Sequence, residues 1–367
     1  MASIFPRSRC ESMMLDTRMQ IERYIEAVPK AELHVHLEGS IQPATLLKLA
    51  EQNNVKLPVE TVEGLQDWFT FRDFNHFIEI YFEISSCLKT SDNYELIAYE
   101  FGAQMARQNI RYAEVTFSPS THEFSLRIPF DVFFSGLTKG RLEARKDFGV
   151  EIRWVFDIVR DIQDMQHNRR RADYTLSVAK EGMKDGVVAL GLGGGEVGHP
   201  PERYVREFEK ALGTGLHSAP HAGETVGPES VWGAIQKLGA ERLGHGVRSI
   251  EDAQLVGFLA ERSIPLEICP TSNIRLGVYP DLAAHPLRRL YDSGVPVTIN
   301  SDDPPLFNTT YNDEAKLLYS PFDFHIDAIN EILLNGLHYS FLPAEEKQAL
   351  EALFQTEMTK LRGELSL

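Results

Sequence analysis

Four segments of this sequence place histidine or acidic side chains directly after apolar runs. The first contains His34 and His36, which share one face of an expected strand because successive side chains alternate. His221, His245 and Asp302 occur in the other three segments. A lone His-x-His pair is also compatible with two hydrogen-bonded histidines at a strand end. Three imidazole-bearing segments together with a carboxylate instead predict a metal site.

This set of donors indicates which metal to expect. Imidazole nitrogens with a carboxylate oxygen suit zinc, which in catalytic sites keeps one position open for water. Magnesium and calcium prefer more oxygen ligands, so Fe²⁺ is the second choice. Cys10, Cys87 and Cys269 are too few and scattered for a Cys-rich zinc site or a disulfide framework. We expect Cys269 to be a buried thiol rather than a ligand.

The elements that must position these residues are strands alternating with amphipathic helices. Eight strands with intervening helices predict an α/β fold, a (β/α)₈ barrel of the TIM type, whose functional residues lie at the carboxyl ends of the strands. The alternative is an open doubly wound sheet, but the Gly-x-Gly-x-x-Gly fingerprint after its first strand is absent. The expected strands are residues 31–36, 111–117, 151–157, 187–192, 217–221, 242–245, 264–269 and 295–300, and the helices between them are 170–184, 202–214, 228–238, 250–261 and 286–292.

Two helical additions to the barrel are expected. A helical insert after strand one, residues 41–108, carries an aromatic cluster from Trp68 to Phe82 that we expect to cover the pocket entrance. Residues 309–367 predict a helical C-terminal extension. We interpret residues 1–16 as a loose tail, without the apolar region of a signal peptide, and residues 17–367 as one domain.

Composition restricts the partners. The net charge is −16 and the isoelectric point about 5.2. This charge opposes binding to nucleic-acid phosphates or to anionic lipid. No apolar run approaches the ~18 residues of a membrane span. We therefore expect a cytoplasmic protein that acts on a neutral or cationic small molecule, with no nucleic-acid or membrane partner.

Six segments, taken in order, resemble the adenosine/adenine deaminase family over roughly residues 25–345. No single segment is decisive, but their order and spacing are specific. The resemblance implies a zinc-dependent barrel that hydrolyses the 6-amino group of adenine-type purines. The segments are His34-Val-His36, Leu192 to Glu196, His221-Ala-Gly-Glu224, Leu243-Gly-His245-Gly246, Cys269-Pro-Thr-Ser-Asn273 and Asn300-Ser-Asp302-Asp303-Pro304.

The resemblance also implies a role for each site residue. A single zinc per chain would supply a metal-bound hydroxide that attacks C6 of the purine. By resemblance, His34, His36, His221 and Asp302 bind the zinc, Glu224 gives a proton to the ring, His245 lies beside the hydroxide, Asp303 meets ring N7, Gly194 offers its N–H to ring N3, and Glu38 meets the ribose.

The chemistry of the residues agrees with these roles. Glu224 follows His221 by three residues, so it can lie beside the metal without binding it. A raised pKa would let Glu224 act as a general acid. Taken alone, Glu224 is equally compatible with a helix cap, and Asp302-Asp303-Pro304 with a turn. Asp303 could donate a hydrogen bond to the ring if protonated, or accept one if ionised.

Other metal hydrolases of the same fold, the unrelated cytidine-type deaminases and binding proteins differ from this family in identifiable residues. A binuclear amidohydrolase usually carries a bridging lysine after strand four, and residues 192–196 contain none. The Pro-Cys-x-x-Cys of cytidine-type deaminases is absent. A binding protein that has lost catalysis would lack a ligand or Glu224. The expected substrate is a purine nucleoside, adenosine first, with aminodeoxyfutalosine or adenine as alternatives.

Several polar residues receive no role. We expect Arg169 to Arg171 to form a solvated helix face. The histidines without a partner pattern are His76, His122, His167, His199, His285, His325 and His338.

Overall fold

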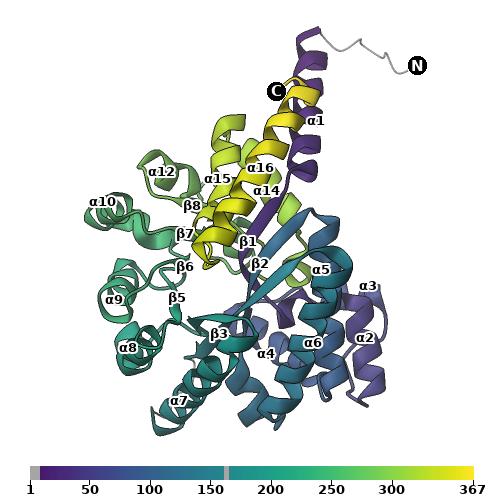
Figure 1. Ribbon diagram of the computed structural model, residues 1–367, viewed down its shortest axis with the longest axis vertical. Helices are drawn as coiled ribbons and strands as arrows, with labels where there is room; N and C mark the ends of the chain where they lie inside the picture. The colour runs from purple at the N-terminus through teal and green to yellow at the C-terminus, as the bar shows by residue number, and fades with distance from the viewer. Residues whose placement is uncertain (1–8, 161–164) are drawn as a thin grey trace.

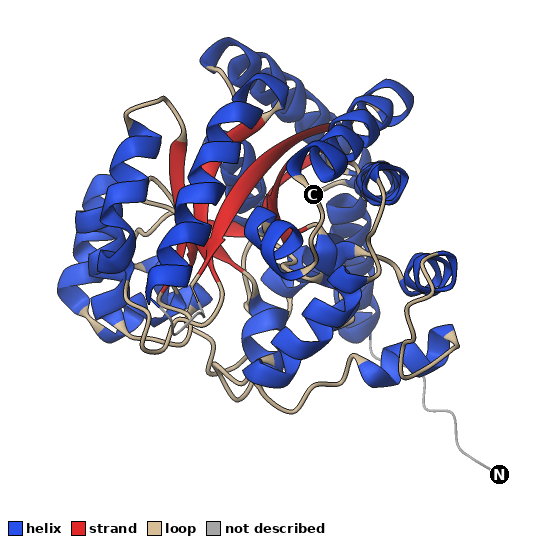
Figure 2. Cartoon of the chain, turned by 90° about the horizontal axis from the view of Figure 1, so that it is seen from below, coloured by secondary structure: helices blue, strands red, loops and turns tan. Residues whose placement is uncertain are grey.

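Eight parallel strands form a barrel in the computed structural model, which describes residues 9–160 and 165–367 (Figure 1). Each strand pairs with the next one along the chain, in the order β1 to β8. Helices surround the strands on the outside (Figure 2), so the predicted (β/α)₈ architecture is confirmed. The strands are β1 (Lys30–His36), β2 (Ile110–Phe117), β3 (Glu151–Val159), β4 (Val187–Gly193), β5 (His217–Ala222), β6 (Leu243–His245), β7 (Leu266–Ile268) and β8 (Val297–Ile299).

The expected helical insert and C-terminal extension are both present. Helices α2 (Pro43–Gln52), α3 (Val62–Trp68), α4 (Phe74–Ser86) and α5 (Ser91–Arg107) form the insert between β1 and β2. Helices α14 (Tyr311–Tyr319), α15 (Ile326–His338) and α16 (Ala344–Leu365) form the extension. The others are α1 (Arg9–Ala27), α6 (Phe130–Phe148), α7 (Met165–Gly182), α8 (Val205–Leu212), α9 (Pro228–Leu238), α10 (Ala253–Arg262), α11 (Pro270–Arg275), α12 (Leu287–Asp292) and α13 (Pro304–Phe307).

Two boundaries differ from the expectation. Helix α1 begins at Arg9, so the segment expected to be a loose tail is helical from that residue onward, and residues 1–8 lie outside the described chain. Helix α6 is present in the structure, where it packs along α5, but it was not predicted from the sequence. None of the helices in the described ranges is both long and apolar enough to cross a membrane.

The two faces of β1 serve different purposes. Ala31 and Leu33 are buried in an apolar cluster with Leu337 of α15 and Phe354 of α16. His34 and His36 occupy the alternate positions, which face the opposite side of the strand. The C-terminal helices therefore fix β1 through its apolar face and leave its histidines at the site.

The barrel closes beside the candidate metal ligands of β1. β8 meets β1 through a parallel bridge between Val35 and Asp302. The His36 N–H donates to the Asp302 carbonyl at 2.9 Å, and the Asp302 N–H donates to the His34 carbonyl at 3.1 Å. Asp302 has φ +62°, a left-handed conformation that is uncommon for a non-glycine residue. The hydrogen bonds that close the barrel thus also bring Asp302 beside the two histidines.

Candidate active site

Four expected metal ligands converge at the carboxyl end of the barrel. His34 and His36 come from β1, His221 from β5, and Asp302 directly follows β8. Asp302 Oδ1 lies 3.4 Å from His34 Nε2 and 3.3 Å from His36 Nε2. The Nε2 atoms of His36 and His221 are 3.3 Å apart. Residues separated by more than 260 positions therefore direct one donor atom each toward the same point.

The surroundings of His34 fit a metal ligand. Its Nδ1 lies 2.9 Å from Glu267 Oε2, and its Nε2 has no hydrogen-bond partner among the described residues. A histidine that donates through Nδ1 to a carboxylate presents its Nε2 lone pair to a metal. Glu267 is in turn held by Arg242, whose Nε donates to Glu267 Oε1 at 2.5 Å. This buried network fixes the orientation of the ring.

Cys269 belongs to a second, overlapping group of potential donors together with His34, His245 and Asp302. Burial raises the pKa of the Cys269 thiol well above its ordinary value, and acidic neighbours add to the effect. A protonated thiol is a poor ligand, because metals bind the thiolate. The group of His34, His36 and His221, completed by Asp302, is therefore the better candidate.

Glu224 lies beside this group without taking part in it. It is 8% exposed, and its Oε1 lies 3.7 Å from His245 Nε2. Burial, together with the nearby charges of Asp302 and Glu196, raises the pKa of Glu224 to about 8. The raised pKa favours the protonated side chain, which is able to act as an acid.

Asp303 is a second buried acid at the site. Burial and the adjacent charge of Asp302 raise the pKa of Asp303 well above its ordinary value. Among the residues that the structure describes, none donates a hydrogen bond to its Oδ1. A Cβ on Gly39 would lie 1.7 Å from that oxygen, so only glycine permits this approach. The protonated carboxyl favours the donor role of the two alternatives left open by the sequence.

A cavity of about 290 Å³ is lined by three of the candidate ligands, His36, His221 and Asp302. Gly194, with φ +78°, lies on its wall together with Glu224, His245 and Asp303. Helix α4 of the insert supplies an aromatic and apolar wall, as expected, whereas Trp68 packs against Phe69 outside the described lining. The residues from α4 are Phe74, Phe77, Ile78, Tyr81 and Phe82.

Glu38 is absent from the described lining of this cavity. It is 1% exposed, and its Oε1 accepts hydrogen bonds from His122 Nε2 at 3.0 Å and from the Ser118 N–H at 3.3 Å. Its Oε2 accepts from the hydroxyl of Tyr81, which does line the cavity, at 3.1 Å. Glu38 therefore borders the cavity through Tyr81. His122, which the sequence left without a role, is a buried partner of this carboxylate.

Glu196 is a site residue whose role the sequence does not reveal. Its carboxylate accepts hydrogen bonds from the backbone N–H groups of Gly223, Glu224, Thr225 and Val226, at 2.7 to 3.2 Å. Although burial opposes it, the charge of Arg160 and these hydrogen bonds lower the pKa of Glu196. An ionised carboxylate thus holds the loop that carries Glu224. The sequence signal for this residue was its place after three consecutive glycines, at positions 193–195.

Arg171 corrects another expectation. Arg169 and Arg170 are exposed as expected, whereas Arg171 is 9% exposed and lines the cavity. One Nη2 donates to the Ser120 carbonyl and to Ser125 Oγ, each at 2.9 Å. Arg171 therefore belongs to the wall formed by the segments that follow β2 and β3.

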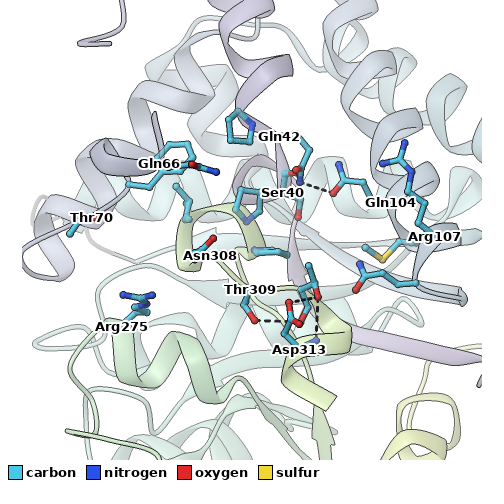
Figure 3. Close-up of a pocket in the computed structure, with 18 of the residues that line it drawn as sticks. Ser40, Gln42, Gln66, Thr70, Gln104, Arg107, Arg275, Asn308, Thr309 and Asp313 are labelled. Carbon is cyan, nitrogen blue, oxygen red and sulfur yellow. Dashed lines mark hydrogen bonds between the residues drawn. The ribbon is translucent and has the colours of Figure 1, made fainter. Parts of the chain in front are cut away.

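A larger cavity of about 680 Å³ lies between the insert and helices α13 and α14 (Figure 3). Amide side chains are prominent in it, and Gln42 Nε2 donates to Gln104 Oε1 at 2.7 Å. Its described lining contains none of the candidate metal ligands or acids. Size alone is therefore a poor guide to the active site here.

Comparison with known proteins gives a consistent picture. The family model for adenosine deaminase matches residues 29–356. The chain is 40% identical over 337 residues to aminodeoxyfutalosine deaminase of Streptomyces coelicolor, covering 90% of this chain and 85% of that protein. It is 35% identical over 323 residues to adenine deaminase of Cupriavidus taiwanensis, covering 88% and 90%. A solved amidohydrolase of Burkholderia ambifaria with bound zinc has a TM-score of 0.86 at 26% identity, covering 95% of each chain.

Proposed function

The chain belongs to the adenosine deaminase family, whose members hydrolyse purine C–N bonds, and we propose that it deaminates the adenine ring of a nucleoside. The observation that carries this proposal is the placement of two buried acids with raised pKa values, Glu224 and Asp303, in one cavity with three of the four converging metal donors, His36, His221 and Asp302. The ring would be gripped at its edges while C6 faces the donors.

We propose zinc as the metal, held by His34, His36, His221 and Asp302. The family is metal-dependent, and the Burkholderia ambifaria structure contains zinc. Three imidazole nitrogens and one carboxylate oxygen suit zinc, with Fe²⁺ as the alternative. When bound, zinc lowers the pKa of a coordinated water from ~15.7 toward about 7 and so makes a nucleophile available at neutral pH.

The side chains account for the movement of protons. Water adds to the ring so that its oxygen bonds to C6, while Glu224 gives its proton to N1 and then recovers one from the water. The C6–N bond breaks as the amino group takes the remaining water proton and leaves as ammonia. Asp303 would donate to N7 and Gly194 would donate its N–H to N3, which fixes the ring.

We propose that a nucleoside is preferred over free adenine. The first candidate is a 5′-substituted nucleoside such as aminodeoxyfutalosine. The named relative at 40% identity supports it over the adenine deaminase at 35%. The cavity of about 290 Å³ extends along α4 to Arg171, and we propose that this part accommodates a substituent beyond the base. We propose that Glu38 acts on the sugar side through the Tyr81 hydroxyl, to which it is hydrogen-bonded.

A substrate screen tests both levels of this proposal. Ammonia release would be measured for aminodeoxyfutalosine, adenosine, 2′-deoxyadenosine and adenine with the metal-loaded protein. We expect the highest kcat/KM for aminodeoxyfutalosine and the lowest for adenine. A higher value for adenine would refute the nucleoside preference, and no release from any of the four would refute adenine deamination.

A further inference from the structure

A chain of buried side chains runs outward from His245, behind the cavity. His245 Nδ1 lies 3.3 Å from Asn273 Nδ2, and Asn273 Oδ1 lies 3.1 Å from His285 Nε2. His285 Nδ1 lies 3.2 Å from the backbone N–H of Leu287. The three side chains are at most 4% exposed. Asn273 therefore joins two imidazoles, one at the site and one behind it.

The hydrogen bond at the outer end of this series of side chains can have only one direction. A backbone N–H can only donate, so His285 Nδ1 must accept from Leu287. Burial lowers the pKa of His285 to about 3, with a smaller contribution from His245, so the ring is neutral. A neutral imidazole carries a single ring proton. Because Nδ1 accepts, this proton must be on Nε2.

The same reasoning continues to the site. His285 Nε2–H requires an acceptor, which is Asn273 Oδ1, so the Asn273 amide presents its NH₂ group to His245. His245 Nδ1 must then accept, which leaves the ring proton on Nε2. That nitrogen lies 3.7 Å from Glu224 and 3.8 Å from Asp302 Oδ2, at the reacting side of the cavity.

We propose that His285 and Asn273 are positioning residues that hold His245 as the neutral Nε2–H tautomer. In this form His245 is a hydrogen-bond donor toward the incoming oxygen and cannot be the base that takes the water's proton. The proposal rests on the proposed function for its effect on turnover, but the tautomer itself is a property of the protein without substrate.

Aromatic side chains pack around the ring of His285 and hold it in position. Tyr279 and Phe322 make edge contacts with its ring, at centroid distances of 5.3 and 5.7 Å. A phenyl ring therefore suits the position in shape while removing both ring nitrogens. His285→Phe is consequently the variant that removes the hydrogen bonds of His285 with the least change in packing.

Nitrogen-15 NMR of histidine-labelled, metal-loaded protein measures the tautomer directly. In the wild type at pH 7.5, we expect His245 and His285 both to be neutral with the proton on Nε2. His285→Phe should leave Asn273 free to rotate, which adds the Nδ1–H form of His245. Its kcat should fall at least several-fold with little change in KM, because loss of one such donor typically costs up to ~10²–10³-fold. His285→Gln, whose amide N–H can replace the lost donor, should recover most of that activity.

His217→Phe is the matched control, since His217 lies at the opposite end of β5 and stacks on Phe341. It should change neither the His245 signals nor kcat. A wild-type His245 protonated at Nδ1 would overturn the proposal, whether or not the protein is active. An unaltered tautomer and kcat in folded, metal-loaded His285→Phe would overturn it as well. If that variant does not fold, the wild-type spectrum alone decides. A correct tautomer in a protein without deaminase activity would instead refute the proposed function.

Discussion

The Nε2 atoms of His36 and His221 lie 3.3 Å apart, although 184 residues separate them in the chain. At this distance either the ring proton of one neutral imidazole or a cation lies between the two nitrogens, because two bare lone pairs repel. Burial lowers the pKa of both rings, which favours the neutral form that binds a metal. With Asp302 Oδ1 3.3 Å from His36 Nε2, the pair fits a metal ion.

Removing the metal should remove the activity. Elemental analysis of the purified protein is expected to find about one zinc per chain, in line with a four-ligand catalytic site. Dialysis against a chelator should reduce ammonia release to background, and one equivalent of Zn²⁺ or Fe²⁺ should restore it. Full activity after exhaustive chelation would contradict the assignment of His34, His36, His221 and Asp302.

Glu224→Gln should separate proton donation from metal binding. The amide keeps the size of the side chain but has no acidic proton, so we expect kcat to fall by roughly 10²–10⁴-fold. Metal content should remain at the wild-type value, because Glu224 is not placed as a ligand. Glu229→Gln, at an exposed position of α9, is the control and should be indistinguishable from wild type. Near-normal kcat in Glu224→Gln would rule out the proposed acid.

The pH dependence should follow the protonation of Glu224. Its pKa is raised to about 8, first by burial, and a bound cation nearby would lower this value. Because the protonated form is the active one, kcat/KM should decline with rising pH, starting no later than about pH 8. A rate profile from pH 6 to 10 measures this limb. A value that stays constant or rises up to pH 10 would show that the acid is another group.

Glu196→Gln should disturb the loop that carries Glu224. A neutral amide cannot accept from four backbone N–H groups as the carboxylate does. We expect kcat to fall about tenfold or more, since hydrogen bonds to a charged group are worth ~1.5–3 kcal/mol. Adding the change to Glu224→Gln should cause little further loss, because both act through one proton donor.

Glu241→Gln is the matched control for Glu196. Glu241 accepts from the backbone N–H of Ser218 near the start of β5, whereas the partners of Glu196 follow the other end of that strand. It should affect stability and leave kcat unchanged. Multiplicative losses in the Glu196/Glu224 double variant would mean that Glu196 acts on the fold in general and not through Glu224.

Phe82→Ala should weaken substrate binding without slowing the chemistry. Phe82 lines the cavity from α4 and is 41% exposed, so its removal should cost little stability. Loss of about 1 kcal/mol of contact corresponds to a roughly fivefold higher KM for the nucleoside. Leu142→Ala, 49% exposed on α6, is the control. An unchanged KM in Phe82→Ala would place the substrate away from α4.

The sequence by itself predicted the barrel, which the structure confirms, and the members of the candidate site. Alternating apolar strands and amphipathic helices are local signals, and in a parallel barrel the carboxyl end of every strand opens onto one face. His34, His36, His221 and Asp302 were therefore predicted to lie at one end of the barrel before any distance was known. The family resemblance supplied their roles and that of Glu224.

Only the tertiary structure decided what surrounds these residues. Burial depends on long-range packing, so the raised pKa of Glu224 and of Asp303 has no local signal. The partners of Glu38, Glu196 and His285 are distant in sequence, and hydrogen bonds between side chains leave no periodicity in the chain. His285 was for that reason assigned no role from sequence, whereas the fold places it two hydrogen bonds from the reacting side of the cavity. A residue's type is written in the sequence, but its protonation and orientation are set by the neighbours that folding brings to it.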